Sequence, residues 1–424
     1  MSRICSIFVL VVSLFCLTPS RASSQDAQAV DRTGALRVFL DCGPCDENYL
    51  RTEITFINYV RDRADADVHV LVTTEETGGG GVEYTLQFIG LGRFADVKQA
   101  LKYVAAQTNT ADETRRGFAA VLRLGLVRYV AETPLASRLK VTFDAPKEAA
   151  AQVVRDPWNF WIFRIGASTN LQGEESQSEK SVDGSLSANR ITENWKMDFG
   201  VEYDYGQETF TLEEGEIFTS VRRELDAEGQ VVKSLTSHWS AGLVGAILSS
   251  TFRNYDLRTR LAPGIEYDVF PYADSTRRIL TLLYTVGVET ADYQEETIYG
   301  KTAENLLNQQ IGVSLGLRQP WGTASASVEM SQYLTDLDKY QVSSFGSLDV
   351  RLFKGFSVEF FGEASRRRDQ LSLRRGDATN EEILVRQREL ATGYQYEVGF
   401  GISYSFGSIF NNVVNPRFRN VGGF

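Results

Sequence analysis

Cys42 and Cys45 are the residues whose type and spacing most directly suggest chemistry. Two cysteines separated by two residues can form a disulfide, exchange it with another thiol, or supply half of a zinc site. A zinc site would need further ligands, and beyond the first 22 residues the sequence holds only this one cysteine pair. The spacing therefore favours a disulfide, structural or redox-active, over a metal site.

The segment Cys42–Cys45, CGPC, resembles the active-site motif of thioredoxins and stands between an expected strand and an expected helix. A helix N-terminus lowers the pKa of a thiol and favours the attacking thiolate. The resemblance stops at the motif, because no Trp precedes it, Asp41 and Asp46 flank it, and the next proline, Pro134, follows a helix. Negative neighbours disfavour a thiolate. We expect a structural disulfide, with thiol–disulfide exchange as the alternative.

The two histidines give little support to catalysis. His69 lies in the apolar run Val68–Val72 and is expected in a core. His238 stands beside Trp239, which is typical of a strand residue at a membrane interface. The glycines 78–81 lack the Lys and the helix of a phosphate-binding loop and instead suit a hairpin turn. We expect no enzymatic activity, no cofactor and no metal.

Charged residues recur with strand spacing in one segment and cluster in another. Asp256, Arg258, Arg260, Glu266 and Asp268 are expected to line the inside of a barrel, where they would border a pore or pair across it. Arg366, Arg367, Arg368, Arg374 and Arg375 form a basic cluster at the longest expected outer loop. This cluster could bind lipopolysaccharide phosphates. The favoured interpretation is a solvated loop balanced by Asp369, Asp377, Glu381 and Glu382.

The elements that carry these charges alternate polar and apolar residues from about residue 155 onward. In 394–406, for example, Tyr and Val, Phe or Ile residues alternate with Gly, Ser, Gln and Glu. The expected strands are often eleven residues or more, the length of tilted membrane strands, and aromatic residues stand near their ends. Residues 155–424 therefore predict an antiparallel transmembrane β-barrel of about twelve strands. The expected strands are 158–170, 178–190, 194–211, 215–225, 231–249, 254–269, 278–292, 308–318, 322–333, 344–353, 355–367 and 392–406.

The connections between these strands fall into two groups. Those after even strands are mostly short, including 227–229 and 320–321, and those after odd strands are mostly longer, notably 293–307 and 368–391. Short periplasmic turns and longer outer loops are typical of outer-membrane barrels. The last strand ends Tyr404-Ser405-Phe406, which resembles the signal read by the barrel-assembly machinery, although eighteen residues follow it.

Residues 158–195 and the later strands, with their short turns containing Gly, Asn and Trp, resemble the salt-induced outer-membrane β-barrel family. The resemblance covers the C-terminal domain only. It implies a barrel fold and no particular activity.

The region 36–147 predicts a small α/β domain. Apolar spacing from Leu50 to Val60 and the stripe from Phe118 to Tyr129 predict helices, the second opened by a Thr110–Glu113 capping box. Residues 68–72 and 82–88 predict strands, and 97–106 predicts a further helix. The fold class is thus α+β multidomain, an N-terminal α/β domain before a barrel.

The start of the chain indicates export. Residues 1–22 predict a signal peptide, because a charged residue, Arg3, is followed by an apolar run and then by small residues before Ser23. The net charge of −11 argues against nucleic acid as a partner. We expect a non-enzymatic protein of the outer membrane, a narrow channel or a structural barrel, whose N-terminal domain docks or gates in the periplasm. Expected partners are outer-membrane lipid and lipopolysaccharide, the barrel-assembly machinery and a periplasmic protein.

Overall fold

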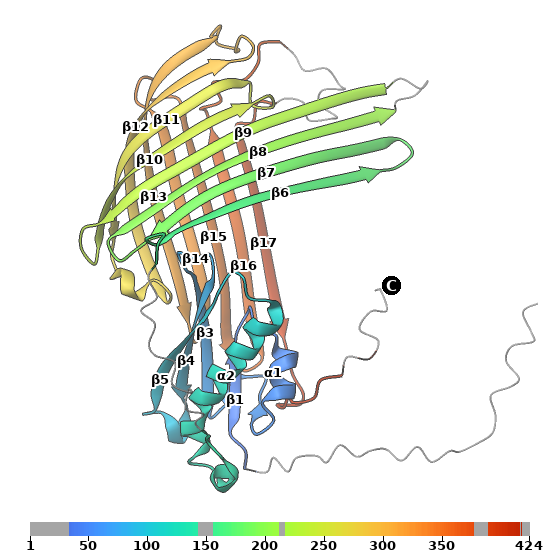
Figure 1. Cartoon of the computed structure of the whole chain (residues 1–424), viewed down its shortest axis with the longest axis vertical. Coiled ribbons are helices and arrows are strands. Elements are labelled where there is room, and N and C mark those ends of the chain that lie inside the picture. The colour runs from blue at the N-terminus through green and yellow to red at the C-terminus, as the bar shows by residue number, and fades with distance from the viewer. Residues whose placement is uncertain (1–33, 143–155, 212–216, 377–388, 416, 418–424) are drawn as a thin grey trace, which may run out of the picture.

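A computed structural model describes residues 34–142, 156–211, 217–376, 389–415 and 417. The expected signal peptide, Asp377, Glu381 and Glu382 lie outside these residues. The described chain forms two sheets, one of five strands and one of twelve (Figure 1).

The N-terminal sheet has the order β2-β1-β3-β4-β5. Strand β1 is parallel to β2 and β3, whereas β3, β4 and β5 form an antiparallel meander. The elements are β1 (Arg37–Asp41), α1 (Glu47–Glu53), β2 (Asn58–Tyr59), β3 (Val68–Glu76), β4 (Val82–Gly90), β5 (Lys98–Ala105) and α2 (Ala111–Val130), with 3-10 turns η1 (Arg63–Asp65), η2 (Gly92–Phe94) and η3 (Pro134–Arg138).

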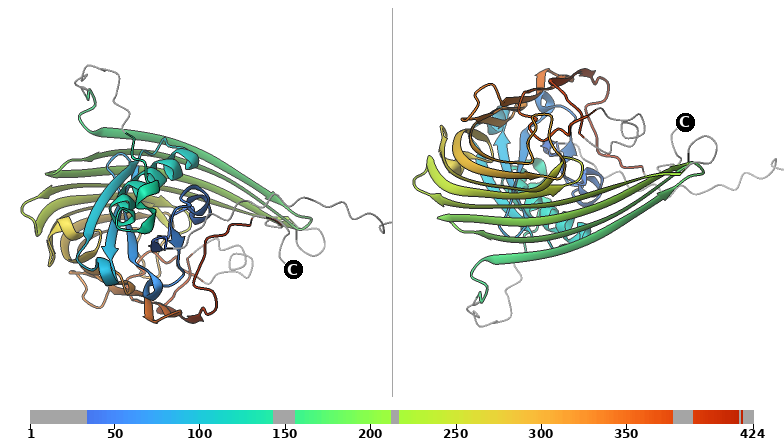
Figure 2. Two further views of the ribbon diagram at one scale, coloured as in Figure 1. Left: turned by 90° about the horizontal axis from the view of Figure 1, so that it is seen from below. Right: turned by 90° about the horizontal axis from the view of Figure 1, so that it is seen from above.

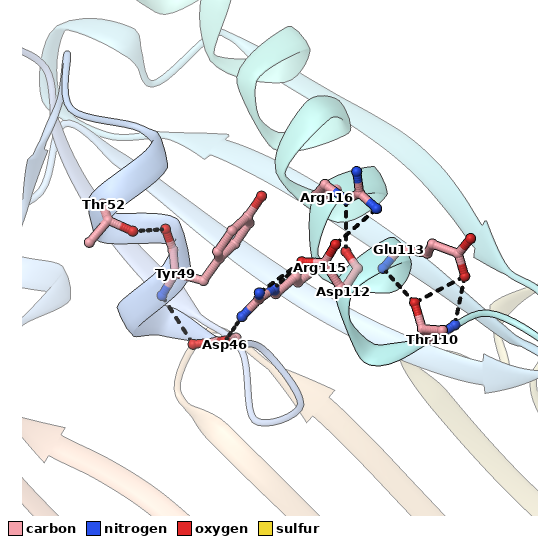
Figure 3. A network of polar contacts seen from close by, with 8 residues as sticks. All are labelled: Asp46, Tyr49, Thr52, Thr110, Asp112, Glu113, Arg115 and Arg116. Carbon is pink, nitrogen blue, oxygen red and sulfur yellow. Dashed lines mark hydrogen bonds and ion pairs between the residues drawn. The ribbon is translucent and has the colours of Figure 1, made fainter. Parts of the chain in front are cut away.

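Helix α2 packs its apolar stripe into the core of this sheet. Phe118, Leu122, Leu126 and Tyr129 are buried together with Phe88 of β4. Gly125 allows this close approach, because a Cβ at that position would stand 2.0 Å from the Phe88 ring. The expected capping box is confirmed, and Glu113 N donates to Thr110 Oγ1 over 3.2 Å while Thr110 N donates to Glu113 Oε2 over 2.8 Å (Figure 3).

Two expected elements of this domain are wrong. Residues 98–105 form strand β5 and not a helix, because Gln99, Leu101 and Tyr103 alternate with more exposed neighbours and the backbone pairs with β4. The first helix ends at Glu53, and Ile57 is buried beyond it, just before β2. Apolar spacing continued past the helix because the following turn also fills the core.

The C-terminal sheet is a continuous antiparallel meander of twelve strands, as expected. The strands are β6 (Trp161–Gly173), β7 (Gln177–Ile191), β8 (Trp195–Thr211), β9 (Ile217–Ser234), β10 (Trp239–Ser250), β11 (Tyr255–Asp268), β12 (Arg278–Tyr293), β13 (Ala303–Gln319), β14 (Gly322–Tyr333), β15 (Tyr340–Phe353), β16 (Phe356–Arg367) and β17 (Tyr394–Tyr404), with a 3-10 turn, η5 (Tyr272–Asp274), before β12.

The expected turn at 227–229 is wrong, because β9 runs through it and pairs on both sides. The turn lies at 235–238, so His238 precedes β10 and does not stand inside a strand. The expected turn rested on Ala227, Glu228 and Gly229, although in a strand with a polar face a charged residue such as Glu228 simply alternates with small or apolar ones.

The sheet is strongly curved but open in this structure. Among the described residues, the edge strands β6 and β17 have no ladder between them, so the expected closed barrel is not formed. Strands β6–β9 lean away from β14–β17 (Figure 1). Seen along the long axis, the N-terminal domain overlaps the space that the curved sheet surrounds (Figure 2).

The two faces of the sheet differ in chemistry. The inner face is the one that carries Arg258, Arg260 and Glu289, and the outer face carries Leu261 and Val288, which are direct cross-strand neighbours. Exposed apolar side chains follow the outer face across the sheet. They include Phe163, Ile165, Val201, Leu243, Leu261, Ile265, Val288, Ile311, Val328, Phe360, Phe400 and Ile402.

Candidate functional site

A buried carboxylate organises one end of the inner face. Glu289 of β12 is 1% exposed. Arg258 of β11 donates to both of its oxygens, each over 2.8 Å. Asn308 of β13 donates to Oε2 over 3.0 Å, and the Tyr333 hydroxyl of β14 donates to Oε1 over 3.2 Å. These partners compensate the burial of the charge, and loss of one partner from such a pair costs about 3–5 kcal/mol.

Arg260 lies beside this cluster with a different set of partners. It is the direct cross-strand neighbour of Glu289, yet its hydrogen bonds go to neutral oxygens. Its Nε donates to Asn308 Oδ1 over 3.2 Å, and its Nη2 donates to Thr285 Oγ1 over 3.1 Å and to Gln310 Oε1 over 3.3 Å. Gln310 in turn donates to Glu329 of β14.

The segment that follows β16 folds over this end of the sheet. Leu371, Ser372 and Leu373 are buried. Asn254 Nδ2 donates to the carbonyl of Ser372 over 2.9 Å, and Ile298 N donates to that of Leu373 over 2.8 Å. The segment 368–376 is thereby held against two other loops, 251–254 and 294–302.

A cavity of about 530 Å³ lies between this cover and the strands. Its lining includes Arg258, Arg260, Glu289, Glu329 and Arg367. Amide side chains supply much of the remaining surface, among them Asn308, Gln310, Gln332, Gln341 and Gln370. Volume and polar lining suit a small hydrophilic solute.

The five residues expected to line the lumen are not one site. Arg258 and Arg260 border the cavity, whereas Glu266 accepts from the Tyr272 hydroxyl near the opposite end of the sheet. Asp268 is buried there and accepts from the backbone N–H groups of Phe270 and Leu280. Asp256 lies at a register shift between Tyr255 and Leu257, where a β-bulge interrupts the alternation.

The five arginines expected to form a basic cluster are distributed among separate contacts. Arg367 pairs with Glu389 over 3.2 Å and lies 3.6 Å from Asp369. Arg374 lies 3.5 Å from Glu295, and Arg375 lies 2.9 Å from Glu296.

The two remaining arginines are placed differently. Arg368 stacks over the Tyr340 ring at 5.8 Å, and Arg366 is opposite Val342 in the β15–β16 ladder. Three of the five thus hold the cover in place by ion pairs.

Carboxylates gather on the inner face of β7–β9. Asp183, Asp204 and Glu224 stand opposite one another across three strands, and Glu202 stands opposite Asp226. Like charges in direct cross-strand positions repel each other, so this face favours cations in the adjacent space.

The N-terminal domain docks at the end of the sheet opposite the cover. Asp41 of β1 accepts two hydrogen bonds from Arg351 of β15, over 2.5 and 2.8 Å, and His69 Nε2 lies 3.1 Å from the same carboxylate. Burial opposes ionisation of Asp41, but the bonds from Arg351 and the contact with His69 outweigh it and lower its pKa to about 2. Burial lowers the pKa of His69 below its usual value.

The β15–β16 turn adds further contacts to this junction. Lys354 lies 2.6 Å from Asp65, and the Gly355 N–H donates to Asp62. Gly355 has φ +73°, a conformation that favours glycine, and a Cβ there would stand 2.1 Å from the Ser405 carbonyl.

The residues after β17 attach the far end of the chain to the N-terminal sheet. Asn411 N donates to the Tyr59 carbonyl over 2.9 Å, Arg61 N donates to the Ile409 carbonyl over 2.9 Å, and Val60 forms an isolated antiparallel bridge with Phe410. Asn412 accepts from Tyr59 N over 2.7 Å. The tail thus extends the sheet beside β2.

The β3–β4 hairpin connects the same domain to the first strands of the C-terminal sheet. The expected glycine turn is confirmed, with Gly80 at φ +68°. A Cβ on Gly80 would stand 1.4 Å from the Arg164 guanidinium of β6, and one on Gly78 would stand 2.7 Å from Ile191. Arg164 also donates to Gln107 over 2.7 Å. The domain therefore contacts strands from both halves of the sheet.

Cys42 and Cys45 are joined by a disulfide. Cys42 is buried, and Cys45 packs against the domain core. A groove of about 270 Å³ borders Cys45 and lies between the starts of α1 and α2. There Asp46 caps α1 and pairs over 3.3 Å with Arg115, which also pairs with Asp112 (Figure 3).

Sequence reasoning missed Glu289, Glu329 and the docking pair Asp41–Arg351. Alternation places a residue on a face, but it does not say which distant strand supplies the partner. Glu289 is the one charged residue in the otherwise neutral stretch 279–291, and that isolation was an available signal.

Within the described ranges, no cluster of His, Cys, Asp or Glu has the arrangement needed to hold a metal ion. None of the helices seen in those ranges combines the length and apolarity that crossing a membrane requires.

Comparison with curated proteins finds no match to this chain. No salt response is named in the description of the family whose model matches part of the chain, so that part of the expected resemblance stays a prediction. Residues 165–367, which run from β6 to the end of β16, match the model of a family described as protein of unknown function, DUF481.

Proposed function

We propose that this protein is a non-enzymatic outer-membrane β-barrel that forms a narrow channel for small hydrophilic solutes, with its N-terminal domain docked at the periplasmic end. The observation that carries the proposal is the contrast between the two faces of the twelve-stranded sheet. Soluble proteins rarely leave so large an apolar surface in water. A hydrocarbon environment matches the outer face, and water matches the charged inner face.

Insertion into a membrane requires that the sheet close. The edge strands β6 and β17, of 13 and 11 residues, carry backbone groups that lipid cannot satisfy. They run in opposite directions, and both present apolar side chains outward, Ile165 on one and Phe400 on the other. We therefore place a β6–β17 ladder at the seam of the inserted barrel.

Cysteine pairs test this seam. A cysteine at Phe163 or Ile165 is combined with one at Phe400 or Ile402, and the protein is oxidised in outer-membrane preparations. One register should give an intramolecular cross-link, seen as a mobility shift that reductant reverses. Absence of cross-linking in all four combinations, with the variants inserted, would refute closure through these strands.

The contacts at the two ends support a restricted path. The cover 368–376 lies at one opening, and the N-terminal domain lies at the other. In this orientation the domain is periplasmic, the cover faces outward, and lipid and lipopolysaccharide surround the apolar face. The barrel-assembly machinery would read the exposed Tyr404 and Phe406 at the end of the last strand.

Cell fractionation and planar-bilayer recording test the function directly. We expect recovery in the outer membrane, with a folded band that heating converts to slower mobility, and small ohmic conductance steps. Recovery in the soluble periplasm would refute the membrane proposal. A silent but inserted barrel would indicate a structural role and refute the channel.

A second candidate function is thiol–disulfide exchange at Cys42 and Cys45. The groove beside Cys45 favours it, since a partner could approach there. Burial of Cys42 opposes it, because an attacking thiolate needs access. Reduction of insulin by the purified protein would support this candidate.

A further inference from the structure

We propose that the cavity beneath the cover binds a small zwitterion, such as a free amino acid, with its carboxylate on Arg260 and its ammonium group on Glu329. The inference deepens the proposed function by naming a solute class, and it rests on that function for the route by which the solute arrives. The geometry of the site is independent of that route.

Most charges around the cavity are already matched. Arg258 is committed to Glu289, as described above, and Arg367 to Glu389 and Asp369. Arg253 lies 3.2 Å from Glu224. These ion pairs occupy the other three arginines of the cavity wall.

Arg260 and Glu329 are the remaining groups. Considering only the residues that the structure describes, Arg260 has no carboxylate within ion-pair distance, and its three hydrogen bonds all go to neutral oxygens. Glu329 is exposed toward the cavity and has no cationic partner among the same residues. A guanidinium and a carboxylate are therefore both available to a solute.

One amide holds these two groups near each other. Gln310 accepts from Arg260 through Oε1 and donates to Glu329 through Nε2. A single amide group thus separates the cation from the anion. This spacing suits a molecule in which a carboxylate and an ammonium group are attached to the same carbon atom.

The chemistry distinguishes this solute class from others of similar size. A phosphate bound to Arg260 would meet the repulsion of Glu329, and a simple cation at Glu329 would meet that of Arg260. A neutral sugar would leave both charges without a counter-charge. A zwitterion satisfies both, and charge-assisted hydrogen bonds are roughly twice as strong as neutral ones.

Calorimetric titration of the full-length refolded protein in detergent tests the inference. The probes are L-glutamine, its N-acetyl derivative, which keeps only the carboxylate, its amide, which keeps only the ammonium group, and glucose. We expect L-glutamine to bind weakly, as a solute that must also leave requires. Each single-charge derivative should bind about 10-fold or more weakly than L-glutamine, and glucose should not bind.

Two substitutions assign the charges. Arg260→Gln should abolish the preference for L-glutamine over its amide, because the carboxylate contact is gone. Glu329→Gln should abolish the preference over the N-acetyl derivative. Folding should be retained, because the Glu329 side chain accepts a hydrogen bond from Gln310 but forms no ion pair with any residue that the structure describes. Arg123→Gln and Glu53→Gln, which separate an ion pair on the N-terminal domain, serve as matched controls and should leave binding unchanged.

Absence of L-glutamine binding by the unaltered protein would overturn the inference, as would equal binding of all four probes or unchanged selectivity in both variants. Binding in detergent does not depend on conduction. Binding without conductance would therefore support the zwitterion site and refute the channel. Conductance without binding would support the channel and refute the zwitterion site.

Discussion

Val328 and Ser327 are sequence neighbours near the middle of β14, and they test which face meets lipid. Val328 is 50% exposed on the outer face opposite Val313, and Ser327 lies on the inner face opposite Ser314. Val328→Arg should place a charge near the bilayer midplane and destabilise the barrel by about 2–4 kcal/mol. That is roughly a 30- to 900-fold loss in the folding equilibrium constant.

Ser327→Arg is the matched control. The new guanidinium would enter a water-filled interior with Glu329 two positions along the same face, so the cost should stay below about 1 kcal/mol. Denaturant titrations of folding into lipid vesicles, followed by gel mobility, measure both variants. Equal costs, or a larger cost for Ser327→Arg, would refute the assignment of the outer face to lipid.

Three further predictions concern other parts of the molecule. Because the pKa of Asp41 is lowered, its contribution to docking of the N-terminal domain should be complete above about pH 4 and be lost as the pH falls toward about 2. Limited proteolysis of the intact protein at a series of pH values should show this loss, and Asp41→Asn should remove the pH dependence. Cys42→Ser should destabilise the N-terminal domain by roughly 2 kcal/mol in thermal unfolding, and the disulfide of the unaltered protein should resist glutathione, with a potential below about −300 mV. The carboxylates on β7–β9 should give the channel a cation preference, measured as a reversal potential in asymmetric KCl, and Asp204→Asn with Glu224→Gln should reduce it; an anion preference would contradict the role of this face.

The sequence pattern predicted where the strands lie better than it predicted which side chains contact each other across them. Two-residue alternation located ten of the twelve strands to within five residues at each end, because each strand separates an apolar from a polar environment. It placed the turn between β9 and β10 too early, at 227–229, and it was wrong at β5, where a short amphipathic strand resembled a helix.

The candidate site was less predictable. Arg258 and Arg260 were assigned to the inner face, but nothing local distinguishes the arginine that is paired from the one that is available. That difference depends on Glu289, Gln310 and Glu329. These residues lie 29 to 71 positions after the two arginines in the sequence and become their neighbours only through the register of four strands.

The pairing of residues 409–412 with the region beside β2 has a consequence for the order of biogenesis. During synthesis the N-terminal sheet emerges before the segment that covers its edge, which follows only after the twelve strands of the C-terminal sheet. Until then this edge presents free backbone groups to other chains, a recognised source of mispairing. With the proposed periplasmic location, the N-terminal domain should therefore depend most on chaperones before residues 409–412 are placed, and their pairing beside β2 would end that dependence.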